Sequence, residues 1–530
     1  MSERGADAIE FAAEPESLSV RAGAAVIAAI LSVTLGSLYF FYSRSLSNLY
    51  GDGLAHVEGA RRLFDSLTPG YLEIGSAWLP LFHILASPFA QNTFLWKTGL
   101  AGSLISAVAF TVTAWFLFRL SLEMNRNIGA AVLSLTVFLL CPSMVFLAST
   151  PLTEPLAIMW AVLVIYGLYR HQQSRGMLPL ATAATAAFFG TLTRYDGWYL
   201  LPFAASFVFW ARGETWRARF WHVTVFSLIS GAGPVLWFIH NAYRYGNVLD
   251  FYNGPHSAKA FYAHQLATTA FRYPTDGSFL LSARYYLADL TLIIGVWPLA
   301  LALLGLLAWA LDTRERSHRA AALLFLVPFV FYVQSMAHAA IPIYVPSLYP
   351  FTYYNLRYGI EMLPAVAIFP SFLLSSRLAP QARKILLGLL LATLTGQGIA
   401  LLVNGASNLA VVQEGIRNNP CRSMRQQAII SFFRSHYDGQ TILVAAGKWP
   451  CVNPELGIPY CKTLSEANLP IWKQVPHGPP SWVGWIIRGN DDVVDELMRA
   501  YPQAFSDFDL VERGQFPGEG SLEIYRRHPG

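Results

Sequence analysis

A cluster of ionisable side chains follows the first apolar segment of the chain, in residues 50–70 (YGDGLAHVEGARRLFDSLTPG). Asp52 and His56 are four positions apart, so both lie on one side of a helix. A carboxylate can act as a general base toward a substrate hydroxyl, and an imidazole can hydrogen-bond an anionic substrate group. Gly-Asp-Gly is also a good helix start, so Asp52 can instead be an N-cap and His56 a histidine that only satisfies a neighbour.

The other charged residues of this stretch favour a solvated helix face. One arc of the helical wheel is apolar and is formed by Val57, Ala60, Leu63, Phe64 and Leu67. The opposite arc holds two opposite-charge pairs at i,i+4 spacing, Glu58 with Arg62 and Arg61 with Asp65. We therefore expect an amphipathic loop helix whose four charged residues face water.

Two short motifs place carboxylates at other helix ends. STPLTEPL puts Glu154 in the first turn of a helix, where a carboxylate is favourable. TRYDGW is a tight turn that contains Arg194 and Asp196, which can pair with each other or face a substrate. Glu154 and Asp196 are therefore candidate catalytic carboxylates beside Asp52.

Candidate substrate-binding residues occur near two further segment ends. NLRYGIEMLP places Arg357 four residues before Glu361, with Tyr358 between them, and His240 and Arg244 follow another apolar run. Each pattern alone can be a structural ion pair. Because all of them fall at segment ends that we expect on one face of a membrane, we predict a polar cavity that opens on that face.

The composition indicates a membrane protein. Of the 530 residues, 54% are hydrophobic and only 13% are charged, whereas about a quarter of an ordinary soluble domain is charged. The net charge of +5 comes from short basic clusters between apolar runs, which are typical of topology signals. We therefore expect membrane lipid, and no nucleic acid, among the partners.

The apolar runs predict a polytopic α-helical protein with about eleven transmembrane helices. A run of roughly 17 to 25 residues crosses the hydrocarbon core. The stretch 78–90 is apolar but contains two prolines, so we expect a juxtamembrane or re-entrant piece. The expected spans are 22–42, 97–119, 129–149, 153–170, 177–193, 197–211, 219–240, 288–311, 319–338, 358–376 and 384–403.

Basic residues predict the orientation of these spans. Threading eleven spans from a cytoplasmic N-terminus places all five basic clusters on the cytoplasmic side, as the positive-inside rule requires. The polar N-terminal stretch lacks a convincing signal-peptide pattern, so the first span is expected to be retained. We predict a plasma (inner) membrane protein whose loop 43–96 and C-terminal part are extracytoplasmic. The clusters are Arg119 and Arg126; Arg170, His171 and Arg175; Arg212, Arg217 and Arg219; Arg314, Arg316 and Arg319; and Arg377, Arg383 and Lys384.

The composition changes after residue 403, where a small extracytoplasmic α/β domain (404–530) is expected to follow the membrane domain (1–403). The domain combines two stretches of helical spacing with four β-like runs. The helical stretches are 424–436 and 492–501, and the β-like runs are 441–446, 482–488, 508–516 and 522–527.

Three of the four cysteines fall in this external domain, so at most one bridge can form within it. Cys451 and Cys461 flank VNPELGIPY, a short turn-rich loop. We therefore favour a disulfide between Cys451 and Cys461 over a bridge that uses Cys421.

These motifs resemble the GT-C superfamily of integral-membrane glycosyltransferases, especially its protein O-mannosyltransferases and lipid A aminoarabinose transferases. The similarity covers roughly residues 20 to 375. It rests on Asp52 in YGDGLAHVEGARRL, on WLPLFHIL at 78–85, on TRYDGWYLLPF and on RYGIEMLPAVAIF. Many relatives carry Asp-Glu at the loop position where this chain has Asp52-Gly53. The sequence therefore does not support a divalent metal cofactor, although one is possible, and we expect no metal ligands.

The resemblance implies a glycosyltransferase that moves a sugar from a polyprenyl-phosphate donor to an acceptor hydroxyl on a protein, lipid or glycan, with inversion. Asp52 would be the base, and Arg357 or Arg194, supported by Tyr358 or His240, would stabilise the departing phosphate. A transporter or flippase for a lipid-linked or small polar substrate is the alternative, and a non-catalytic membrane scaffold is a third. We favour the enzyme, because the sequence has almost no mid-span charges and no internal repeat.

Overall fold

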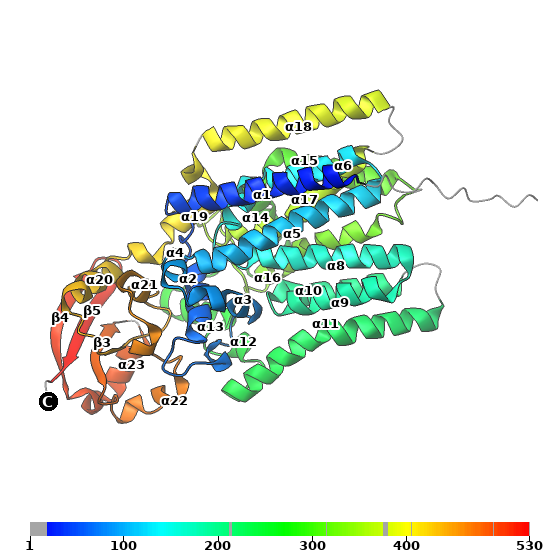
Figure 1. The fold of residues 1–530 in the computed structure, drawn as a ribbon. Helices are drawn as coiled ribbons and strands as arrows, with labels where there is room; N and C mark the ends of the chain where they lie inside the picture. The colour runs from blue at the N-terminus through cyan, green and yellow to red at the C-terminus, as the bar shows by residue number, and fades with distance from the viewer. Residues whose placement is uncertain are drawn as a thin grey trace, which may run out of the picture.

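The structure is a computed structural model that describes residues 18–210, 215–313, 315–374, 380–403, 405–490 and 492–528. A bundle of long helices leads at one end to the C-terminal sheet, with the short helices of the first loop between them (Figure 1). The α-helices up to the C-terminal domain are α1 (Val20–Ser43), α2 (Gly51–Arg62), α3 (Leu81–Ala90), α4 (Thr93–Thr98), α5 (Leu100–Asn125), α6 (Ile128–Leu139), α7 (Pro142–Leu147), α8 (Glu154–Ser174), α9 (Met177–Thr191), α10 (Tyr195–Phe209), α11 (Trp216–Tyr245), α12 (Asp250–Asn253), α13 (Ala258–Thr269), α14 (Phe279–Ile293), α15 (Val296–Leu311), α16 (Val327–Ala337), α17 (Leu363–Ile368), α18 (Pro380–Val403) and α19 (Ala410–Arg417). The 3₁₀ helices are η1 (Tyr71–Glu73), η2 (Ala320–Leu326), η3 (Leu356–Met362), η4 (Phe369–Leu374) and η5 (Ala406–Asn408).

Five helical segments in the described part of the chain are long and apolar enough to cross a membrane, or six if the bent pair α14 and α15 forms one span. The five are Val20–Ser43, Leu100–Asn125, Trp216–Tyr245, Ala320–Ala337 and Leu356–Leu374. The chain is thus a multi-pass membrane protein, but the expected count of eleven spans is not confirmed. Residues 1–17 and the basic residues Arg212, Arg314 and Arg377 lie outside the described residues, as does the Arg383 side chain, and the orientation stays a prediction.

Two of the expected spans are interrupted. The run 129–149 ends as a helix at Leu139 and restarts at Pro142, because proline is favoured at a first helical position but not inside a helix. The run 288–311 bends by 115° between α14 and α15, where Gly295 adopts a φ of 103° that other residues rarely tolerate. Hydropathy alone does not reveal either break.

The bundle brings four segment starts together at the end that faces the C-terminal domain. Helix α8 packs against α5 and α9, and α9 packs against α11. Gly167 of α8 permits this close approach, because a Cβ there would lie 2.9 Å from the Cβ of Ala183 on α9. The starts of α2, α8, α10 and η3 supply the charged residues described below.

The C-terminal part contains a five-stranded sheet of order β2-β1-β3-β5-β4, which confirms the expected small sheet. Strand β1 is parallel to β2 and β3, and β5 is antiparallel to β3 and β4. Apolar side chains cover both faces of the sheet. The elements are α20 (Met424–His436), α21 (Val452–Leu456), α22 (Leu469–Trp472), α23 (Val493–Ala500), η6 (Pro420–Arg422), η7 (Tyr460–Lys462), η8 (Val475–His477), η9 (Pro502–Phe505), β1 (Thr441–Leu443), β2 (Thr463–Leu464), β3 (Val483–Gly489), β4 (Phe508–Phe516) and β5 (Gly520–Arg527). The exact domain boundary at 403 stays a prediction.

The expected Cys451–Cys461 disulfide is wrong. The structure pairs Cys451 with Cys421, whose Cα atoms lie 5.5 Å apart, and Cys461 is free and exposed. Packing of α20 against α21 brings Cys421 and Cys451 into the range that a disulfide requires. Cys461 lies on η7, where its backbone N–H donates to Asp65 at 3.0 Å.

Candidate active site

Arg357 lies in the first turn of η3 and connects the starts of two other helices. Its Nη2 donates a hydrogen bond to Oδ2 of Asp52 in the first turn of α2. Its Nε donates to Oε1 of Glu154, the first residue of α8, at 2.8 Å. The hydroxyl of Tyr358 accepts from the same Nη2 at 3.2 Å. Arg357 and Glu154 are buried, whereas the Asp52 side chain is 43% exposed, so Asp52 is the accessible end of this chain of contacts.

Arg194 extends the chain of contacts from the start of α10. Its Nη1 lies 3.3 Å from the same Oε1 of Glu154, and its Nε lies 3.1 Å from Oε1 of Glu361 and 3.5 Å from Oδ2 of Asp196. Tyr332 of α16 accepts a hydrogen bond from Arg194 Nη2 at 3.0 Å and donates to Glu361 at 2.7 Å. The two guanidinium groups thus connect five segments: α2, α8, α10, α16 and η3.

We call these residues the arginine network: Asp52, Glu154, Arg194, Asp196, Tyr332, Arg357, Tyr358 and Glu361. Four carboxyl groups share two arginines, so acidic groups outnumber basic ones. Burial raises the pKa of Asp52, but the attraction of the Arg357 guanidinium outweighs it and holds the pKa of that carboxyl below its ordinary value. Asp52 is therefore a carboxylate at neutral pH. Among the described residues, no group of three or more His, Cys, Asp or Glu side chains is arranged to hold a metal ion.

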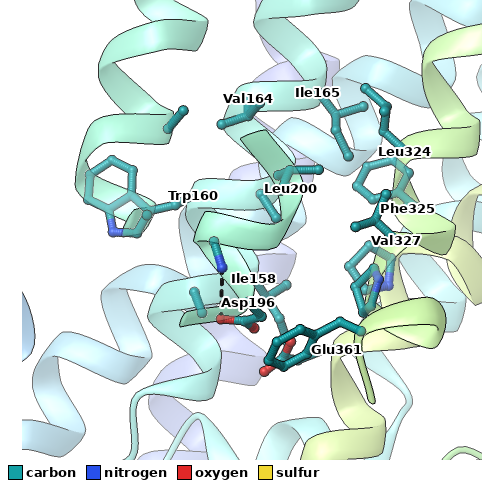
Figure 2. A pocket seen from close by; sticks show the side chains of 18 residues that line it. Ile158, Trp160, Val164, Ile165, Asp196, Leu200, Leu324, Phe325, Val327 and Glu361 are labelled. Atoms are coloured by element: carbon teal, nitrogen blue, oxygen red, sulfur yellow. Dashed lines mark hydrogen bonds between the residues drawn. The ribbon is translucent and has the colours of Figure 1, made fainter. Parts of the chain in front are cut away.

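An apolar groove ends at this network (Figure 2). It lies between α8, α9, α10, η2 and α16, and its cavity volume is about 50 Å³. Its walls include Trp160, Val164 and Leu200, and its polar end is formed by Asp196 and Glu361. A long apolar chain with one charged end matches this lining, because the walls exclude water and the polar end offers charged partners.

Most of the predicted site residues meet in the network. The sequence grouped seven of its eight members, namely Asp52, Glu154, Arg194, Asp196, Arg357, Tyr358 and Glu361. Asp52 is not the N-cap of α2, because Tyr50 occupies that position and the Asp52 carboxylate accepts from Arg357. The alternative that Arg357 and Glu361 form a structural pair is not what the structure has: Arg357 pairs with Glu154, and Glu361 pairs with Arg194.

The structure places His56 outside the network. Its Nδ1 lies 3.1 Å from Nε2 of His83, and its ring packs against Trp78 with the centroids 4.6 Å apart. Burial lowers the pKa of His56 to about 4 and that of His83 to about 3, so both rings are neutral at physiological pH. His56 is therefore not a cation for a phosphate.

His240 and Arg244 also lie apart from the network. The His240 ring stacks on Trp237, with the centroids 4.6 Å apart, and its edge meets Tyr71 of the first loop. Arg244 donates to the carbonyl of Ala467 in the C-terminal domain at 3.2 Å. The contacts of both residues fix the loop and the domain on the end of α11.

Two buried groups beside the network were not anticipated. Glu414 of α19 accepts from the backbone N–H groups of Asn355 and Leu356 at the start of η3. The hydroxyl of Tyr50 lies 3.2 Å from Glu414. The pattern of α19 contained a signal, because Val411, Gly415 and Glu414 fall on one buried helix face.

The charged face of α2 is not solvated, which corrects the expectation for Glu58, Arg61, Arg62 and Asp65. The two i,i+4 pairs form, at 3.6 Å for Arg62 with Glu58 and 2.7 Å for Arg61 with Asp65. However, Arg61 and Arg62 are buried, and Arg62 also donates to Glu73 at 2.6 Å. The C-terminal domain covers this face, and a polar pocket between them is lined by Glu58, Arg62, Tyr460 and Asn468.

Comparison with known proteins relates the fold to solved structures. No family model and no curated protein matches the chain. The crystal structure of ArnT from Cupriavidus metallidurans bound to undecaprenyl phosphate superposes with a TM-score of 0.58 at 13% identity, covering 96% of this chain and 98% of that one. The apo ArnT structure gives 0.56 at 14% identity, with 95% and 98% covered. The chain thus shares its overall fold with ArnT. Whether it belongs to the GT-C superfamily, and which activity it has, stays a prediction.

Proposed function

We propose that this protein is a membrane glycosyltransferase that transfers a sugar from a polyprenyl-phosphate donor to an acceptor hydroxyl, with inversion. The observation that carries the proposal is the accessible Asp52 carboxylate, held by Arg357, in a charged network at the end of an apolar groove. The bound undecaprenyl phosphate of the ArnT structure supports a lipid-linked donor for this fold. The sugar and the acceptor, whether protein, lipid or glycan, are open.

Asp52 acts as the general base in this proposal. Its carboxylate takes the proton of the acceptor hydroxyl while the oxygen attacks the anomeric carbon. The bond between that carbon and the lipid phosphate breaks, and its electron pair leaves with the phosphate. A phosphate that engages Arg357 would loosen the ion pair with Asp52 and thereby make Asp52 a stronger base.

The remaining network residues position the donor. The polyprenyl chain lies in the apolar groove, and its phosphate approaches Arg194 and Arg357, whose guanidinium groups stabilise the departing charge. Glu154 orients both arginines through one oxygen. Asp196 lines the polar end of the groove and is the second candidate base.

A transporter or flippase is the second candidate function, and one feature favours it. Helices α14 and α15 form a broken pair with a 115° bend, and Asp289 is buried in α14. Broken helices with buried charges are typical of transporters. Covalent transfer in detergent separates the two, because transport needs a sealed vesicle and changes no bond.

Mass analysis of glycolipids and glycoproteins from a deletion strain tests the function first. The missing sugar identifies donor and acceptor together. The purified full-length protein in detergent should then transfer that sugar from its undecaprenyl-phosphate form. A deletion strain with unchanged glycans, or purified protein without turnover on any polyprenyl-phosphate sugar, would refute the enzyme.

The proposed sidedness has its own test. We place the C-terminal domain outside the cytoplasm of the plasma (inner) membrane, with the N-terminus inside. A reporter that is active only in the cytoplasm, fused after Gly530, should stay silent. Strong reporter activity would reverse the topology and move the network to the cytoplasmic side.

A further inference from the structure

Glu414 connects the C-terminal side of the chain to both halves of the Asp52–Arg357 ion pair. It lies on α19, the first α-helix after α18, and its side chain is buried. Its Oε1 accepts from the N–H of Asn355 at 2.5 Å, and its Oε2 accepts from the N–H of Leu356 at 3.0 Å. These two groups begin η3, immediately before Arg357.

The same carboxyl group meets the segment that carries Asp52. The hydroxyl of Tyr50 lies 3.2 Å from Oε2 of Glu414, and Tyr50 is the N-cap of α2, two residues before Asp52. The two elements also approach closely, because a Cβ on Gly415 would lie 2.8 Å from Leu49. One carboxyl group therefore contacts the starts of the two helices that present Asp52 and Arg357.

We propose that Glu414 is a positioning residue that keeps Asp52 and Arg357 within ion-pair distance of each other, and that it does so in its ionised form. The proposal rests on the proposed function for its consequence in catalysis. Glu414 itself does not contact the substrate in this proposal.

The local geometry explains why ionisation matters. A carboxylate accepts from two backbone N–H groups at a helix start, where negative charge is favourable. The Tyr50 hydroxyl has one proton and two nearby acceptors, the carbonyl of Val411 at 2.6 Å and Glu414 at 3.2 Å. A protonated Glu414 would instead donate to the Tyr50 oxygen and bind the start of η3 less strongly. Protonation thus shifts the contact from η3 toward α2.

The surroundings of Glu414 place this change near neutral pH. Burial raises the pKa of Glu414 to about 7, against the attraction of Arg357 and the two backbone N–H groups. The titratable groups that face it are Tyr50 before α2, Arg357 on η3 and Asp289 on α14. The other packed elements, α7 and η5, carry no titratable side chain.

Infrared titration of the full-length protein in detergent tests positioning without any donor. The band of the Asp52 carboxyl is assigned by its loss in Asp52→Asn. Two variants disturb the contact: Glu414→Gln removes the charge, and Gly415→Ala keeps Glu414 but pushes α19 away from Leu49. In both variants the pH midpoint of Asp52 should rise by about one to three pH units, because Arg357 moves away from Asp52. Glu466→Gln is the matched control, because burial also raises the pKa of Glu466 to about 7 at a site in the C-terminal domain.

The pH profile of transfer then tests ionisation. The wild-type rate should fall about tenfold per pH unit below pH 7. Glu414→Gln should be slower and lose the break near pH 7, and any acid limb that remains should follow the raised Asp52 midpoint; Gly415→Ala should be slower with the break near pH 7 kept, and Glu466→Gln unchanged. An unshifted Asp52 midpoint in both Glu414→Gln and Gly415→Ala, or a break near pH 7 that persists in Glu414→Gln, would overturn the proposal. A shifted midpoint in protein that transfers no sugar would leave the positioning role intact and refute only the proposed function.

Discussion

At its start, α2 contributes Asp52 to the arginine network, and at its end it contributes Arg61 and Arg62 to a second cluster of ion pairs. Both clusters are built from carboxylates and arginines, and both are largely buried. They differ in what surrounds them. The first borders an apolar groove and keeps Asp52 accessible, whereas the second is covered by the C-terminal domain.

The contacts also differ in kind. Arg62 lies between Glu58 and Glu73, and Asp65 additionally accepts from the backbone of Cys461, so these groups join the loop to the domain. In the arginine network, two cations are shared among four carboxyl groups, and a new anion can compete for them. Exposure and charge balance, rather than the residue types, distinguish a candidate site from a structural interface.

The comparison is tested most strongly at Asp52. Asp52→Asn retains size but removes the proton acceptor, so transfer should fall by roughly 10²–10⁴ while thermal stability changes little. Initial rates and thermal unfolding of the purified protein measure both. A fully active Asp52→Asn with saturating donor would transfer the role of base to Asp196 or Glu154.

Arg357 should give the next largest effect. Arg357→Lys keeps the charge but cannot reach Asp52 and Glu154 at once, because an ammonium lacks the forked geometry of a guanidinium. We expect a loss of about 10² in kcat, the scale of removing one preorganised donor. Arg434→Lys, at an exposed arginine of the C-terminal domain, should have no effect. Equal rates for the wild type and Arg357→Lys would exclude Arg357 from the chemistry.

The sequence grouped most of the network because its members stand at segment ends on one expected face. It did not predict their pairing. Arg357 and Glu361 are four residues apart, which aligns side chains on an α-helix, but η3 is a 3₁₀ helix with three residues per turn, so the two side chains diverge. Their true partners, Glu154 and Arg194, come from other helices and depend on tertiary packing.

Other errors have the same origin. A helical wheel identifies the charged face of α2 but not the domain that covers it. The short loop between Cys451 and Cys461 favours their pairing, but the packing of α20 on α21 brings Cys421 to Cys451 instead. The small sheet was predicted from alternating apolar runs, with the exception of β2, whose two residues are too few for a pattern. Local periodicity predicted most helices and strands but not the breaks within two expected spans, and it did not predict the contacts between distant segments.

At the far end of α2, mutation should affect stability rather than rate. Arg62→Met leaves Glu58 and Glu73 buried without their partner, which should destabilise the protein by about 3–5 kcal/mol. Transfer per folded molecule should stay within about threefold of wild type, since the cluster borders no substrate groove. Thermal unfolding and rates corrected for the folded fraction check this. Normal stability with lost transfer would instead assign the cluster to the active site.

Glu414→Gln should give the smallest effect. The direction in which its Tm difference changes with pH is informative, because stability favours the neutral carboxyl group and positioning favours the ionised one. The pKa of Glu414 is raised to about 7 by burial, so its contribution to stability is fully present below the unfolded pKa of about 4.5 and is lost as pH rises through 7. Glu414→Gln is permanently neutral and avoids that loss. The Tm of Glu414→Gln relative to wild type should therefore increase between pH 5 and pH 8, whereas the deficit of Arg62→Met should grow over the same range, because Glu58 and Glu73 ionise there without their partner. Thermal scans of both variants at several pH values decide this. A Glu414→Gln difference that is constant with pH would mean that Glu414 does not titrate near neutrality.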